Sequence, residues 1–162
     1  MKRGMSNASF DHVGEGSAMS LAQCGLADLP AGLDPMLTAL DASGNVLTSC
    51  QALAPLTHLV RLDLSDNQLG PGLGGALASL PSLTALSLER NRLAQLAGEL
   101  QGCQGLVRLN VGRNRLRSLE GLFPEGEWGG KLQELRLCHA VSGSRRRELP
   151  LELWTLTRLT LL

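Results

Sequence analysis

Three glycines in this chain stand at a spacing that can bind phosphate. Gly70, Gly72 and Gly75 form a G-x-G-x-x-G sequence, which in dinucleotide-binding proteins lets the backbone approach a pyrophosphate. Pro71 removes a backbone donor from this loop. The leucines on both sides continue a regular repeat, and no separate crossover unit of about 30 residues surrounds the glycines. We therefore expect no nucleotide site here.

The histidines and cysteines offer no metal site and no nucleophile. His12, His58 and His139 lie far apart, and Cys138-His139 has no second pair of ligands at zinc spacing. If these two residues belong to a strand, they also point to opposite faces. No Ser/His/Asp or Cys/His set can be assembled from equivalent strand positions. The sequence predicts a chain with no catalytic residues, no metal and no cofactor.

The regular repeat is the strongest feature of the chain. The phrases LVRLDLSDNQL, LTALSLERNRL and LVRLNVGRNRL match the pattern L-x-x-L-x-L-x-x-N-x-L, and weaker copies precede and follow them. Each L-x-x-L-x-L stretch predicts a short strand with inward leucines, and the asparagine amide can satisfy backbone groups where the chain turns. The predicted ladder comprises Cys24, Asn45, Asn67, Asn91 and Asn114, and it should lapse at Ala140.

This pattern predicts an α/β leucine-rich repeat solenoid, curved and right-handed, with a parallel concave sheet. Short helices or turns, within 51–59 and 73–83 for example, should close the convex side. We expect a disordered segment over 1–15 and one repeat domain of about six repeats over 16–162. The last residues, Leu159 to Leu162, begin a further repeat, so we expect a fragment of a longer protein, and the alternative is an edge covered by a partner or a second copy. The isolated chain should then self-associate through this uncapped end.

Composition favours an intracellular protein, cytoplasmic or nuclear. Cys24, Cys50, Cys103 and Cys138 are spread one to a repeat, so we interpret them as reduced thiols in or near the core, and a disulfide framework is the less favoured alternative. The N-terminal stretch lacks the apolar segment of a secretory signal, and no apolar run is long enough to predict a membrane span.

Charge is unevenly distributed although the formal net charge is zero. Residues 1–89 carry three basic and eight acidic side chains, a balance of −5, and residues 90–162 carry twelve basic and seven acidic, a balance of +5. One end of a linear solenoid should then be acidic and the other basic. The asymmetry is either incidental to a solvated surface or the field that steers a partner of complementary polarity.

The variable positions between the inward leucines should face the concave side and a protein partner. Strand residues are also polar because they meet water, so polarity alone does not establish an interface. The candidate partner-binding residues are Asp41, Arg61, Asp63, Glu89, Arg90, Arg108, Asn110, Arg113, Glu134 and Arg136.

Two segments outside the strands are possible loop anchors. The insertion at 123–130 carries Phe123 and Trp128, and Trp128 either plugs the edge of the solenoid or forms an exposed anchor. Arg145, Arg146 and Arg147 form a basic triplet that either is solvated or meets an acidic protein or phosphate. Nucleic-acid binding is a weak alternative, because stacking aromatics are scarce and the chain has no net basic charge.

From about Ala18 onward the chain resembles the intracellular leucine-rich repeat superfamily. The stretch LDLSDNQLGPGLGGALASLPSLTALSLERNRL is similar to repeats of the acidic leucine-rich nuclear phosphoproteins and of the leucine-rich regulatory subunit of protein phosphatase 1. LPLELWTLTRLTLL is more similar to the Ras-pathway and plant intracellular group. The resemblance implies binding of a protein through the concave face and adjoining loops, without a cofactor. The alternative is a structural repeat segment of a larger protein whose functional domain lies elsewhere.

Overall fold

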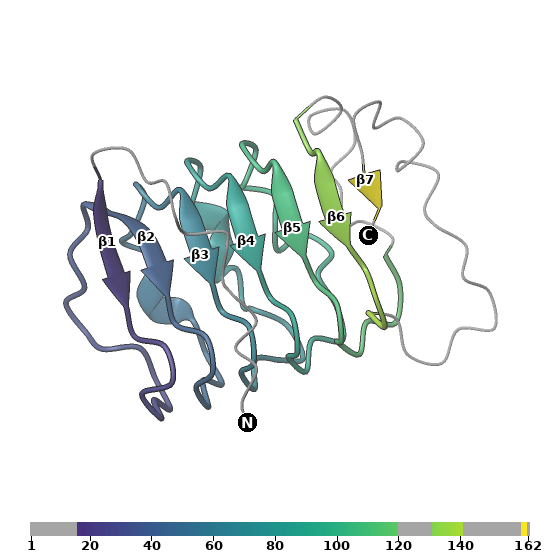
Figure 1. The fold of residues 1–162 in the computed structure, drawn as a ribbon, viewed down its shortest axis with the longest axis horizontal. Helices are drawn as coiled ribbons and strands as arrows, with labels where there is room; N and C mark the ends of the chain where they lie inside the picture. The colour runs from purple at the N-terminus through teal and green to yellow at the C-terminus, as the bar shows by residue number, and fades with distance from the viewer. Residues whose placement is uncertain (1–15, 120–130, 141–159, 162) are drawn as a thin grey trace, which may run out of the picture.

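The computed structural model describes residues 16–119, 131–140 and 160–161. Within them, seven strands form one parallel sheet in chain order (Figure 1). The strands are β1 (Ser17–Ser20), β2 (Leu37–Asp41), β3 (Arg61–Asp63), β4 (Ala85–Ser87), β5 (Arg108–Asn110), β6 (Glu134–Arg136) and β7 (Thr160–Leu161). Each strand pairs with the next along the chain, which is the arrangement of a solenoid. The predicted architecture is confirmed.

The repeat leucines stack in register to form the core. Across five strands the aligned positions are Leu40, Leu62, Leu86, Leu109 and Leu135, and all five are buried. Because side chains alternate along a strand, these leucines point inward and both flanking residues point to the other face. The core therefore runs continuously through the stack, each layer packed on its neighbours.

Single helical turns lie on the far side of this core. The 3-10 helix η1 spans Gln51–Leu53, and η2 spans Ala76–Ser79. Both fall within segments predicted to return along the convex side, and both lie behind the strands in Figure 1. Leu53 and Leu77 in these turns are buried, so the turns cover the side of the leucine core that faces away from the sheet.

The asparagine ladder joins successive turns, as predicted. The side-chain oxygen of Asn67 accepts the backbone N–H of Leu47 at 3.0 Å, and its amide donates to the carbonyls of Ala42 and Leu64 at 3.0 and 3.1 Å. Asn45, Asn91 and Asn114 make equivalent bonds, and all four asparagines are buried. One amide thus satisfies backbone groups of two turns, which keeps the buried polar groups paired.

Both ends of the ladder differ from the middle. Cys24 is exposed, and its thiol donates to the carbonyl of Ala22 in its own turn at 3.5 Å. At the other end Ala140 stands where an asparagine would, and the N–H of Leu116 bonds to the backbone carbonyl of Ala140 at 2.9 Å. A main-chain acceptor replaces the missing amide, so the ladder lapses where predicted while the donor stays paired.

A left-handed residue precedes each ladder position. Their φ values are 57° at Gln23, 67° at Gly44, 53° at Asp66, 54° at Arg90, 54° at Arg113 and 53° at His139. For a residue with a Cβ this conformation costs about 1 kcal/mol. Each strand ends before this residue, which corrects the prediction that strand alternation continues through Glu89, Arg90 and Arg113. These three follow the ends of β4 and β5 and lie in turns.

The cysteine interpretation is half right. Cys50 and Cys103 are buried, whereas Cys24 and Cys138 are exposed, and none of the four is in a disulfide. Cys24 follows β1, which lies at the end of the sheet and whose four residues are all exposed, so the turn that carries Cys24 is exposed as well. The interpretation as reduced thiols in or near the core therefore fits Cys50 and Cys103 and does not fit the two exposed cysteines.

Some predicted features lie outside the described residues. These are the segment 1–15, Phe123, Trp128, Arg145, Arg146 and Arg147, and the side chains of the last residues. Within the described part of the chain, no helix has the length and hydropathy needed to cross a membrane.

Candidate protein-binding surface

The face of the sheet opposite the leucine core carries two aligned columns of side chains, which we call the open face. One column contains Arg61, Ala85, Arg108 and Glu134, and the other contains Asp41, Asp63, Ser87, Asn110 and Arg136. These are the columns predicted from strand alternation. Ala39, which continues the first column onto β2, differs from expectation because only 1% of its surface is exposed. The part of the open face that a partner can contact therefore begins at Asp41 and Arg61.

Three polar residues of the second column hold the turns that follow their strands. A side-chain oxygen of Asp41 accepts the N–H of Ser43 at 3.0 Å and its hydroxyl at 2.7 Å. Asp63 accepts the N–H of Ser65 at 2.8 Å, and Asn110 accepts that of Gly112 at 3.1 Å. These are side-chain turns of the kind that Asp and Asn favour. Each residue thus has a structural role in addition to any contact with a partner.

Acidic groups gather on the N-terminal part of this surface. Burial raises the pKa of the Asp63 carboxyl, and the nearby charges of Asp41 and Asp66 raise it further, against the lowering effect of hydrogen bonds from Ser65. Ionised Asp63 is therefore less stable in the folded protein than in an unfolded chain. A cationic group from a partner would relieve this cost.

Arginines and a glutamate occupy the C-terminal part of the open face. Glu134 lies 3.7 Å from the guanidinium of Arg108 and 2.7 Å from that of Arg136. Both arginine side chains are about half exposed, at 57% and 50%. Exposed pairs of this kind contribute about 1 kcal/mol or less to stability. Their main effect is to present guanidinium groups in fixed positions on the open face.

A second cluster lies at the edge where the strands end. Arg90 lies 3.3 Å from Asp66 and 3.8 Å from Glu89, and Arg113 also lies 3.8 Å from Glu89. Asn110 donates to the other oxygen of Glu89 at 2.9 Å. One carboxylate thus bridges two arginines of successive turns.

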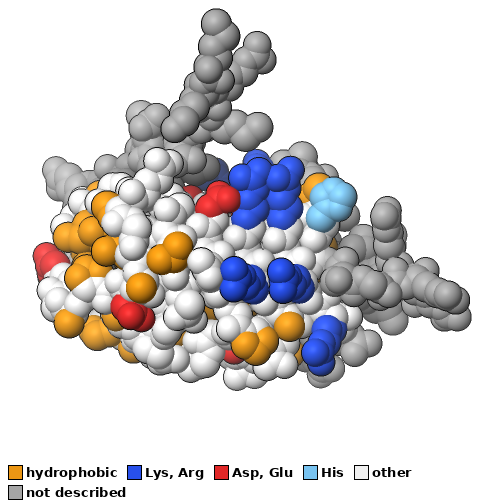
Figure 2. Space-filling view, turned by 90° about the horizontal axis from the view of Figure 1, so that it is seen from below, with side chains coloured by type: hydrophobic (Ala, Val, Ile, Leu, Met, Phe, Trp, Pro, Cys, Tyr) orange, Lys and Arg blue, Asp and Glu red, His pale blue; other side chains and the backbone are white. Residues whose placement is uncertain are grey.

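Sequence reasoning missed three arginines beside this cluster. Arg92, Arg115 and Arg117 follow the ladder asparagines and are exposed. With Arg90 and Arg113 they form what we call the basic edge. Figure 2, which looks onto the ends of the strands, shows Lys and Arg side chains gathered on the C-terminal half of this edge. The signal was present in the repeated R-N-R sequence at 90–92 and 113–115.

The glycine loop binds a carboxylate of the chain itself. Glu99, from the next repeat, accepts the N–H groups of Leu73 at 3.0 Å and Gly74 at 3.2 Å through one oxygen, and that of Gly75 at 2.8 Å through the other. Successive backbone donors of this kind form an anion-binding nest. Because Glu99 occupies it, the loop has no free donors there for a phosphate.

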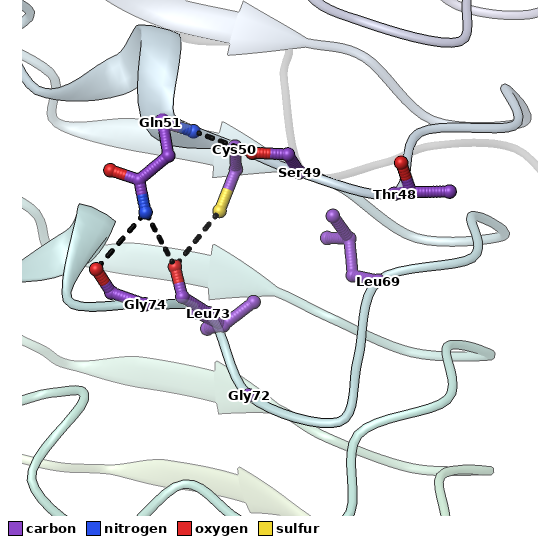
Figure 3. Close-up of a pocket in the computed structure, with 8 residues that line it drawn as sticks. All are labelled: Thr48, Ser49, Cys50, Gln51, Leu69, Gly72, Leu73 and Gly74. Atoms are coloured by element: carbon purple, nitrogen blue, oxygen red, sulfur yellow. Dashed lines mark hydrogen bonds between the residues drawn. The ribbon is translucent and has the colours of Figure 1, made fainter.

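A pocket of about 160 Å³ lies between the turns that carry η1 and η2 (Figure 3). The amide of Gln51 donates to the carbonyls of Leu73 and Gly74 at 3.4 and 3.0 Å, and the Cys50 thiol lies 3.9 Å from the same Leu73 oxygen. Burial raises the pKa of the Cys50 thiol to about 12, and Glu99 contributes to the shift. This thiol stays protonated and is a poor nucleophile.

Cys138 and His139 lie in a turn, which corrects the assumption of adjacent strand residues. Over residues 16–119 and 131–140, no three His, Cys, Asp or Glu side chains are grouped so that they could hold a metal ion.

Comparisons with known proteins agree with the repeat architecture. The family described as Leucine Rich repeat matches residues 56–73. Decorin from Oryctolagus cuniculus is 34% identical over 99 residues, which cover 60% of this chain and 28% of decorin. Decorin from Equus caballus is 34% identical over 80 residues, covering 48% and 22%. This chain thus spans less than a third of the length of these relatives.

Solved structures show the same fold. An internalin from Listeria monocytogenes superposes with a TM-score of 0.60 at 22% identity, covering 78% of this chain and 34% of that one. Internalin C2 from the same organism gives 0.58 at 25% identity, covering 78% and 62%. These matches support leucine-rich repeats, but they do not support the finer resemblance to nuclear phosphoproteins or to the phosphatase subunit.

Proposed function

We propose that this chain, a leucine-rich repeat protein, binds a protein partner through the open face of its sheet without catalysing a reaction. The observation that carries the proposal is the alignment of the two columns from β3 to β6. Their side chains lie on the face away from the leucine core, and the register places them in fixed rows. Such an array of polar groups on a rigid scaffold is suited to recognition.

The anchors of this interface are arginines. The described residues include no Phe, Trp or Tyr, and interfaces are usually anchored by Trp, Tyr and Arg. Arg108 and Arg136 are half exposed and lie beside Glu134, so their guanidinium groups are accessible to the acceptors of a partner. We infer that the partner offers carboxylate or carbonyl acceptors opposite β5 and β6.

A matched pair of variants tests this proposal. The first carries Arg108→Gln and Arg136→Gln, and the control carries Gln101→Glu and Gln104→Glu, two exposed positions outside the open face. Both variants lower the net charge by two. We expect proteins captured from a cell extract by the unchanged chain to be lost with the first variant and kept with the control. Equal capture by all three chains would show that the interface lies outside the open face.

Capture of nothing would instead favour the alternative that this segment supports a larger protein whose functional domain lies elsewhere. Circular dichroism establishes that each variant is folded.

We also propose an intracellular location, supported by the four unpaired cysteines. Microscopy of the tagged native protein tests that location, and accumulation in the culture medium would overturn it.

A further inference from the structure

Three arginines of the basic edge lack an ionic partner in the described part of the chain. Arg92, Arg115 and Arg117 are exposed and make no ion pair with any described residue. Their backbone N–H groups are all bonded, to Leu69, Leu93 and Ala94 in the preceding repeat. A ligand at this edge would therefore meet guanidinium groups and not an open backbone ladder.

Elsewhere in this chain, a carboxylate bridges two arginines that lie close together on the surface. Glu89 bridges Arg90 and Arg113, and Glu134 bridges Arg108 and Arg136. Arg92 and Arg115 occupy equivalent positions after Asn91 and Asn114, and successive turns of such a sheet are about 5 Å apart. Unlike the other two pairs, this one has no bridging carboxylate among the described residues.

We propose that the basic edge binds an acidic peptide segment of a partner protein, with a carboxylate between Arg92 and Arg115 and another near Arg117. Guanidinium groups bind carboxylates in a bidentate geometry, and two close cations gain from a shared anion. The row of arginines that begins at Arg92 is short. In the two preceding turns the equivalent position carries Gln68 and Val46, which are uncharged. The patch therefore fits a few acidic residues.

Nucleic acid fits this edge less well. Single-strand binders stack successive bases chiefly on Phe, Tyr and Trp, and the described residues include none of these. The basic row also ends after two turns, whereas a nucleic-acid groove follows the backbone over several nucleotides. Asp66 and Glu89 lie at the border of the patch and limit its length for any anion, so a short acidic segment fits better than a nucleic-acid backbone that continues along it.

The test is fluorescence anisotropy with a labelled oligoglutamate peptide at about 0.15 M salt. We expect measurable binding by the unchanged chain and about tenfold weaker binding by the Arg92→Gln, Arg115→Gln variant. The control is Gln101→Glu with Gln104→Glu, two exposed positions outside both the open face and the basic edge, which changes the net charge by the same amount and should bind within about twofold of the unchanged chain. The Arg92→Lys, Arg115→Lys variant keeps the charge and should bind less tightly than the unchanged chain, because the fork geometry is lost.

Three results would overturn the proposal. They are the absence of peptide binding, an equal loss of binding in the Arg92→Gln, Arg115→Gln variant and in the control, and tighter binding of an oligothymidylate of equal charge. The edge is separate from the open face, so the capture experiment and this titration can fail independently. The lysine variant keeps the test decisive if the glutamine variant does not fold.

Discussion

The side-chain oxygen of Asn91 accepts the backbone N–H of Leu69, one turn earlier, at 2.9 Å. The amide of the same residue donates to the carbonyls of Leu64 and Leu88 at 2.9 and 3.1 Å. Asn91 is buried, so water cannot replace these bonds. A single side chain thus joins the turns on both sides of a repeat boundary.

Replacing Asn91 by alanine should therefore weaken the whole stack. Asn91→Ala leaves one buried N–H and two carbonyls without this partner, and we expect the free energy of unfolding to fall by about 2 to 3 kcal/mol. Urea denaturation followed by circular dichroism measures the change. Gln68→Ala, at a partly exposed position next to the ladder, should change stability by about 0.5 kcal/mol or less. Similar losses in both variants would show that the ladder is not the cause.

Glu99 should stabilise the glycine loop through its three hydrogen bonds. Glu99→Ala removes an acceptor from the N–H groups of Leu73, Gly74 and Gly75, and we expect a loss of about 1 to 3 kcal/mol in urea denaturation. Because the vacated nest suits an anion, added phosphate should restore part of the lost stability in this variant. No difference in the effect of phosphate between the variant and the unchanged chain would contradict this explanation.

Asp63 should give stability a dependence on pH in the acid range. Its pKa is raised in the folded protein above its ordinary value of 3.8, so the ionised form costs stability that is regained as pH falls through the folded pKa. Asp63→Asn keeps an oxygen for the N–H of Ser65 and removes the charge. We expect this variant to be more stable than the unchanged chain near neutral pH, with the gap narrowing in acid. Thermal melts across this range measure the gap, and Asp41→Asn is the matched variant one strand away. A gap that does not change with pH would contradict the assignment.

The buried thiols should make the protein sensitive to alkali. Burial raises the pKa of Cys50 to about 12 and that of Cys103 to about 11, from an ordinary value of 9.0. Above that ordinary value the unfolded chain loses these protons while the folded chain keeps them, so stability falls as pH rises toward the folded values. Cys50→Ala combined with Cys103→Ala should flatten this decline, as followed by urea denaturation at increasing pH.

A labelling experiment checks the same burial independently. A maleimide dye should react first with Cys24 and Cys138, which are exposed, and reach Cys50 and Cys103 only in denaturant. Equal labelling of all four thiols in the folded protein would contradict both the burial and its pKa consequence. Peptide mapping identifies which cysteines carry the dye.

The repeat consensus predicted the ladder and the open face because it encodes local geometry directly. Leucine spacing determines which side chains of a strand point inward, and the asparagine marks the turn, so Asn67 and the column from Asp41 to Arg136 could be placed from sequence. The same alternation was wrong where it was continued past the end of a strand. Arg90 and Arg113 lie beyond that end, in a left-handed conformation that their residue type does not indicate, whereas Gly44 at an equivalent position does.

Other differences depend on neighbours that the repeat consensus does not contain. Cys24 occupies a ladder position, yet the strand before it lies at the end of the sheet and its thiol is exposed. Glu99 and the glycine loop come together only because successive turns stack, and they lie 24 to 26 residues apart in sequence. Arg92 and Arg115 likewise become neighbours only because successive turns stack. The basic edge was therefore not predicted from the repeat consensus.

The left-handed residue before each ladder position has a consequence for how such a surface can change. Gln, Gly, Asp, Arg and His all occupy this position in successive turns with φ between 53° and 67°. The backbone there is set by the turn and not by the side chain, so the residue can be exchanged without disturbing the leucine layers. A duplicated repeat would add one more side chain to the row at the same interval. The basic edge can thus lengthen by duplication of whole repeats, and its charge can change through single substitutions at this position.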